Sequence, residues 1–207
     1  MTPEAVVFDI GNVLIEWNPE RFYDREIGEA ARLRLFAEVD LHGMNLAVDA
    51  GAPFAASVAA LAARHPEWAP QILWWHDRWT ETLTPRIEHS ISLLRALRAK
   101  GVPVFALTNF AVETFAIATA RIDFFSEFDR SFVSGHLGLI KPDPAIYAHV
   151  EAQTGIAPEG LFFTDDKAAN TKAAARRGWQ THPFTGAEGL ARRLTDLGLL
   201  TEAEATS

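Results

Sequence analysis

Polar residues capable of chemistry stand where apolar segments of the sequence end. They are Asp9, Thr108 with Asn109, Lys141 in a later loop, and the pair Asp165 and Asp166. If the apolar segments are parallel strands of one sheet, their carboxyl ends lie along one edge, where open α/β sheets bind their ligands. The sequence therefore predicts that these carboxylate, hydroxyl, amide and ammonium groups meet in a single site.

The three carboxylates of this predicted site require a positive charge between them. Asp9, Asp165 and Asp166 would repel one another by several kcal/mol at an effective dielectric constant of about 20. Mg²⁺ is the expected cation, because it prefers oxygen ligands and shares its coordination with substrate phosphate oxygens. Lys141 and Thr108 would hold the rest of a phosphoryl group, which leaves an oxygen of Asp9 free to attack phosphorus.

Short runs rich in Val, Phe and Ile alternate with helical patterns along the chain. We predict strands at 5–9, 102–108, 130–133, 161–165 and 180–183. Helices are predicted between the later strands, where apolar residues recur at spacings of three and four and glycines follow. This alternation indicates an α/β fold, a Rossmann-like doubly wound parallel sheet with helices on both faces.

A long interval between the first two predicted strands breaks this rhythm. It contains helical patterns at 21–39, 53–64 and 70–83. A simple crossover between parallel strands needs far fewer residues. We therefore predict an α/β core at 1–15 and 85–200, an inserted helical cap at 16–84, and a frayed tail at 201–207.

Four short motifs carry a family resemblance. The sequence has FDIGNVL at 8–14, LTN at 107–109, KPD at 141–143 and FTDD at 163–166. In this order they resemble the four motifs of the haloacid dehalogenase superfamily. The inserted cap is similar to that of its small phosphatases and dehalogenases, and the FDxGNV form resembles bacterial sugar-phosphate phosphatases.

The resemblance implies a role for each matching residue. Asp9 would be the nucleophile and a metal ligand, and Gly11 would offer its backbone carbonyl to the metal. Thr108 and Asn109 would bind the phosphoryl group, and Lys141 would neutralise the charge between nucleophile and phosphate. The remaining metal ligands would be Asp166 and Asp165, the latter directly or through water.

Gly11 departs from the pattern of the family's phosphatases, most of which have a second Asp here. That Asp protonates the leaving group and later activates water, which Gly cannot do. Loss of a general acid or base costs about 10²–10⁴-fold in rate. Either a cap residue or water takes over the role, or the substrate has a good leaving group, or turnover is slow.

Two other functions remain open from the sequence. A 2-haloacid dehalogenase would use Asp9 on carbon without a metal, although the adjacent Asp165 and Asp166 would hamper a carboxylate substrate. A weakly active or inactive binding protein of the same fold is supported only by Gly11. In the cap, Trp17 or Arg21 could touch substrate.

Composition limits the partners of the protein. The 207 residues carry a net charge of −8, and no cysteine is present. The absence of Cys excludes thiol catalysis and Cys-ligated metals. The acidic balance gives no basic face for nucleic acid, and the apolar segments are too short for a membrane span. We expect a cytoplasmic protein, of undetermined oligomeric state, that acts on a small phosphorylated molecule.

Overall fold

A five-stranded parallel sheet forms the centre of the molecule. The computed structural model describes residues 1–206. The strands are β1 (Ala5–Phe8), β4 (Val104–Thr108), β5 (Arg130–Val133), β6 (Leu161–Asp165) and β7 (Gln180–Pro183). Their order is β5-β4-β1-β6-β7, and all neighbours are parallel. The predicted doubly wound sheet is therefore confirmed, with its topological switch point at β1, between β4 and β6.

Side chains of β1 alternate between two hydrophobic cores, as the pleat of a strand requires. Val6 and Phe8 belong to one core, and Ala5 and Val7 to the other. Four helices cover these faces, α6 (Glu88–Ala99) and α11 (Ala187–Asp196) on the first and α9 (Pro144–Thr154) and α10 (Ala168–Arg176) on the second. The connections contain α7 (Val112–Arg121), η3 (Asp123–Ser126), α8 (Ser134–Leu137) and η4 (Pro158–Gly160).

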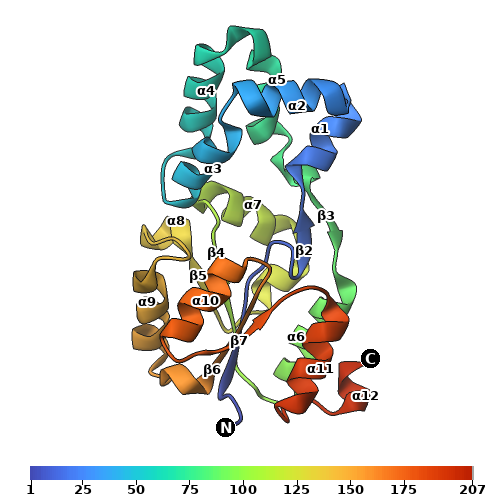
Figure 1. The fold of residues 1–207 in the computed structure, drawn as a ribbon, viewed down its shortest axis with the longest axis vertical. Coiled ribbons are helices and arrows are strands. Elements are labelled where there is room, and N and C mark those ends of the chain that lie inside the picture. Colours follow the sequence, from blue (N-terminus) through green and yellow to red (C-terminus); the bar gives the residue numbers. More distant parts are fainter. Residues whose placement is uncertain (207) are drawn as a thin grey trace.

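The chain leaves the sheet after β1 and returns before α6. It runs out along β2 (Ile15–Trp17) and back along β3 (Leu83–Arg86), which pair antiparallel. Between them lie α1 (Pro19–Ile27), α2 (Glu29–Glu38), α3 (Leu41–Asp49), α4 (Phe54–Arg64), η1 (Pro66–Trp68), α5 (Ala69–Asp77) and η2 (Trp79–Thr82). These helices stand at one end of the molecule, above the sheet (Figure 1). We call residues 16–84 the cap.

The cap helices differ in extent from the prediction. The helix predicted at 21–39 is two helices, because Gly28 adopts a φ of 79° and turns the chain between α1 and α2. The helix predicted at 70–83 ends at Asp77, and the 3₁₀ turn η2 follows. Helix α3 was not predicted, although Asp40 caps it by accepting a hydrogen bond from the Gly43 amide at 2.8 Å.

The prediction of a frayed tail is wrong for residues 201–205. Helix α12 (Glu202–Ala205) begins with a capping box, in which Thr201 and Glu204 each bond the backbone of the other. Ala205 is buried in the first core, and its carbonyl lies 2.8 Å from Nε2 of His89 in α6. The small residues of this segment suggested fraying, but tertiary packing orders them. Ser207 lies outside the described residues.

Helix lengths also bear on membrane association. Over residues 1–206, none of the helices combines the length and the apolar character that crossing a membrane would require.

Candidate active site

A cavity of about 390 Å³ lies between the carboxyl ends of the strands and the cap. Six of the seven predicted site residues line it, namely Asp9, Gly11, Thr108, Asn109, Lys141 and Asp166. They come from the ends of β1 and β4 and from the loops after β5 and β6. The topology thus brings together groups that are far apart in the sequence.

Lys141 forms the centre of a buried charge cluster. Its Nζ lies 3.0 Å from Oδ1 of Asp9 and 2.7 Å from Oδ2 of Asp165. It also donates to the Leu107 carbonyl at 2.7 Å. The Ile10 amide donates to the same Oδ1 of Asp9 at 2.7 Å, which leaves Oδ2 outside these contacts. The Asp9 carboxylate is therefore held by one oxygen, in a strand-end position that faces the cavity.

Asp165, the seventh predicted residue, lies behind the cavity wall and is fully buried. Oδ1 accepts from the Lys167 amide at 2.8 Å, and Nδ2 of Asn170 lies within 3.0 Å of both carboxylate oxygens. With Lys141 on Oδ2, both oxygens of Asp165 are engaged. These contacts place Asp165 where it orients Lys141, and Asn170 braces the Asp165 carboxylate.

Asn12 joins the strand-end loops to the cap. Its Nδ2 donates to Oδ2 of Asp166 at 3.1 Å, and its Oδ1 accepts from the Trp17 amide in β2 at 3.0 Å. Asn12 has a φ of 57°, the left-handed region in which Asn is one of the few tolerated residues. The sequence analysis noted Asn12 only as part of a motif, and its linking contacts were missed.

Thr108 and Asn109, the residues predicted to bind a phosphoryl group, line the cavity beside Lys141. Thr108, at the end of β4, is buried and lines the cavity. Asn109 exchanges two hydrogen bonds with the Lys141 backbone, donating Nδ2 to its carbonyl at 3.0 Å and accepting from its amide at 2.9 Å. The Asn109 side chain therefore fixes the loop that carries the lysine.

Burial makes the negative charges of this site unfavourable. It raises the pKa of Asp9 to about 7; Lys141 opposes the rise, and the charges of Asp165 and Asp166 add to it. Burial is also the main cause that raises the pKa of Asp166. For Lys141, burial lowers the pKa, but the neighbouring carboxylates Asp9 and Asp165 together raise it above its ordinary value.

These carboxylates fit a hard cation. Asp9, Asp165 and Asp166 each have an oxygen within 4.8 Å of those of the other two. Carboxylate oxygens are the ligands that Mg²⁺ prefers, and a divalent ion would offset the burial and the charge repulsion that raise the pKa values of Asp9 and Asp166. Asp9 and Asp166 face the cavity together with Gly11, whereas the oxygens of Asp165 are occupied within the protein.

The cap contributes residues that the sequence analysis missed. Asn45, Leu46 and Asp49 of α3 line the cavity, and so does His42 near the start of that helix. Apolar residues at Leu41, Met44 and Val48, spaced by three and four after the N-cap, would have revealed the helix. Because Leu41, Met44 and Val48 face the cap interior, His42, Asn45 and Asp49 lie on a different face of the helix, which lines the cavity.

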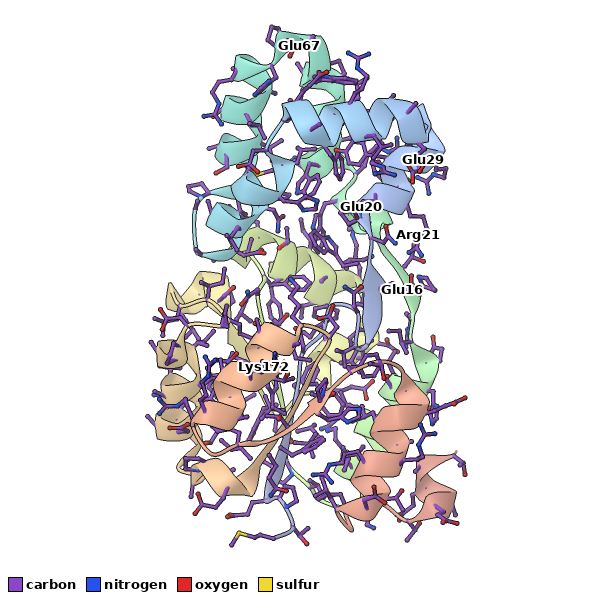
Figure 2. All side chains as sticks on the ribbon, viewed as in Figure 1. Glu16, Glu20, Arg21, Glu29, Glu67 and Lys172 are labelled. Carbon is purple, nitrogen blue, oxygen red and sulfur yellow. The ribbon has the colours of Figure 1, made fainter. Side chains whose placement is uncertain are left out.

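Two aromatic residues of the cap line the cavity as well. Trp17 does so from β2, and Trp79 does so from η2, where its side chain is also part of the hydrophobic core. Arg21 is not among the lining residues. Arg21 instead forms an ion pair with Glu16 of β2 at the surface of the molecule (Figure 2), so the structure does not support its predicted contact with substrate.

The parallel sheet and the carboxylates clustered at its strand ends are the arrangement of an α/β enzyme with its site at the carboxyl edge of the sheet. Residues 3–178 match the hydrolase family described as haloacid dehalogenase-like, and the chain belongs to this family. The predicted superfamily is therefore confirmed.

Curated relatives include two hydrolases of phosphorylated compounds by name. Over 107 residues the chain is 32% identical to the chloroplast flavin mononucleotide hydrolase 1 of Arabidopsis thaliana, in a match covering 52% of this chain. The chain spans only 43% of that relative's length. It is 26% identical over 179 residues to the sesquiterpene phosphatase astK of Aspergillus oryzae, covering 84% of this chain and 85% of that protein.

Solved structures share the fold. The family enzyme bt-2542 of Bacteroides thetaiotaomicron aligns with a TM-score of 0.74 at 22% identity, over 94% of this chain and 99% of that one. The same enzyme is known in complex with magnesium and inorganic phosphate. L-2-haloacid dehalogenase of Xanthobacter autotrophicus aligns with a TM-score of 0.63 at 20% identity, over 98% and 86% of the chains.

Proposed function

We propose that this hydrolase is a Mg²⁺-dependent phosphatase of a small organophosphate that works through an aspartyl-phosphate intermediate. The observation that carries the proposal is the setting of Asp9. Its Oδ1 is held by Lys141 and the Ile10 amide while the carboxylate lines a cavity of substrate size. A fixed carboxylate beside a buried cation suits attack on a phosphoryl group.

In the proposed reaction, an oxygen of Asp9 attacks phosphorus and the leaving oxygen departs on the opposite side. Lys141 neutralises charge between the carboxylate and the phosphoryl oxygens, and Asp165 keeps its ammonium in place. Thr108 donates its hydroxyl to a phosphoryl oxygen, and Asn109 holds the lysine loop. Asp9, Asp166 and the Gly11 carbonyl would hold Mg²⁺, which neutralises phosphoryl charge when bound. Water then hydrolyses the aspartyl-phosphate.

The organic part of the substrate would contact the cap side of the cavity. Trp17, Leu46 and Trp79 offer apolar surface, while His42 and Asn45 offer polar groups. This mixture suits a small phosphate ester. The relatives named for flavin mononucleotide and sesquiterpene phosphates support the phosphate ester, and the FDxGNV resemblance keeps sugar phosphates among the substrates to test.

The metal-free dehalogenase is less well supported by this geometry. A 2-haloacid carries its own carboxylate, which would approach Asp166 in a site where burial already disfavours negative charge. Likewise, a binding protein without activity has no need of a buried Lys141 placed 3.0 Å from Asp9. We therefore propose phosphate ester hydrolysis.

The direct test is phosphate release from a panel of sugar, aryl and alkyl phosphates, measured with Mg²⁺ and with excess chelator. We expect release with Mg²⁺, loss of release in chelator, and loss in Asp9→Asn, since the amide is a poor nucleophile of nearly the same shape. Asp77→Asn is the matched control, because its carboxylate is exposed at the end of α5. Full activity in chelator, or halide release from a 2-haloacid, would overturn the proposal.

A further inference from the structure

Gly11 has no side chain that could protonate the leaving group from the position two residues after Asp9. It lines the cavity two residues after Asp9, and the nearest atom to a Cβ built there would be Cβ of Trp17 at 3.9 Å. The position is therefore open to a side chain and has none. An alkoxide is a poor leaving group, so efficient hydrolysis of alkyl phosphates needs an acid from elsewhere.

Asp49 of α3 brings a carboxyl group to the cap side of the same cavity. Nδ2 of Asn45, one turn earlier, donates to its Oδ2 at 2.9 Å. The backbone of Ala111 hydrogen-bonds the same carboxylate, and Oγ of Ser134 donates to the Asp49 carbonyl at 2.6 Å. Both of these partners belong to the core, so the end of α3 is fastened to the strand-end loops rather than moving freely with the cap.

The environment of Asp49 favours its protonated form. Burial raises the pKa of Asp49 to about 7; Lys167 opposes the rise and the charge of Asp9 adds to it. An acid with a pKa near the working pH transfers protons efficiently. The other titratable groups lining the cavity are Asp9, His42, Lys141, Asp166 and Lys167. His42 turns toward Glu20, 3.3 Å from its Nε2, at an exposed position of the cap.

We propose that Asp49 is the general acid and base of this enzyme, a role that Gly11 has no side chain to perform. The inference rests on the proposed phosphatase function. As Asp9 attacks, the bond from phosphorus to the leaving oxygen breaks, and that oxygen takes the proton of the Asp49 carboxyl. In the second step the Asp49 carboxylate accepts a proton from the attacking water. Phosphate is released, and both carboxyl groups return to their starting states.

The test is kcat/KM for a series of phosphate esters with graded leaving-group pKa, in the wild type and in Asp49→Asn, with Mg²⁺. In the wild type we expect a weak dependence on the leaving group. In Asp49→Asn we expect alkyl esters to lose about 10²–10⁴-fold, whereas aryl esters, whose oxygen hardly needs a proton, change little. Retained aryl hydrolysis also reports that the variant is folded. Asp40→Asn is the control, since it removes a carboxylate from the same helix and Asn caps helices equally well.

Three results would overturn the proposal. Alkyl hydrolysis equal to wild type in Asp49→Asn would remove Asp49 from the chemistry and leave the phosphatase function standing. An equal loss for aryl and alkyl esters would make Asp49 a structural residue. If the wild type released phosphate from none of the esters, the phosphatase function itself would be refuted, and the inference with it.

Discussion

Lys141 shows how one buried cation organises the site at the scale of single residues. Its ammonium group is directed at three oxygens, those of Asp9, Asp165 and the Leu107 carbonyl. A lysine this deeply buried is stable only because paired charges and hydrogen bonds replace water. The KPD motif predicted a function for Lys141, but the sequence did not reveal that Asp165 would pair with its ammonium group.

Removing this cation should destabilise the protein. Lys141→Ala leaves Asp9 and Asp165 as unpaired buried carboxylates, and breaking a buried pair costs about 3–5 kcal/mol. The free energy of unfolding, measured by chemical denaturation in chelator, checks this. Lys100→Ala is the matched control. Its exposed pair with Glu204 should contribute less than about 1 kcal/mol. Equal costs for the two variants would contradict the account.

At the scale of elements, the hydrophobic pattern predicted the core well. All five predicted strands and helices α6, α9 and α10 are present, because apolar runs, N-caps and terminal glycines carry local signals. The cap was predicted less well. The turn at Gly28 depends on one φ angle, and α3 has a modest apolar stripe. Since α3 carries Asn45 and Asp49, the cap half of the site was missed with it.

Asn12, in the loop after β1, hydrogen-bonds both Asp166 and the Trp17 amide of the cap. These contacts lead to a prediction for metal binding. Asn12→Gly keeps the left-handed backbone and removes the hydrogen bonds to Asp166 and the Trp17 amide. Because partners of metal ligands typically tune affinity by about 10–100-fold, we expect Mg²⁺ affinity, measured by titration calorimetry, to fall by about tenfold or more.

Asn12→Ala separates the two contributions of this residue. It removes the same hydrogen bonds and adds strain at a φ of 57°, so it should bind Mg²⁺ no better than Asn12→Gly and should also unfold at a lower temperature. Unchanged Mg²⁺ affinity in Asn12→Gly would show that Asn12 does not position Asp166 for the metal.

At the scale of the whole molecule, a protein of net charge −8 encloses a cavity between its sheet and its cap, which we propose binds an anionic substrate. Two lysines that could attract an anionic substrate, Lys141 and Lys167, line this cavity. The core side of that cavity could be predicted because strand ends in a parallel sheet share one edge. For the cap side, a local pattern could have located α3, but the position of that helix over the strand ends depends on tertiary packing.

The central claim is that Asp9 forms a covalent phosphoryl intermediate, and rapid acid quenching with mass spectrometry tests it most directly. The wild type is mixed with an aryl phosphate and Mg²⁺, quenched, digested and mapped. The account predicts a phosphoryl adduct on the peptide containing Asp9 that appears within the first turnover and is absent from Asp9→Asn. Steady phosphate release without any adduct, or with an adduct on another residue, would contradict it.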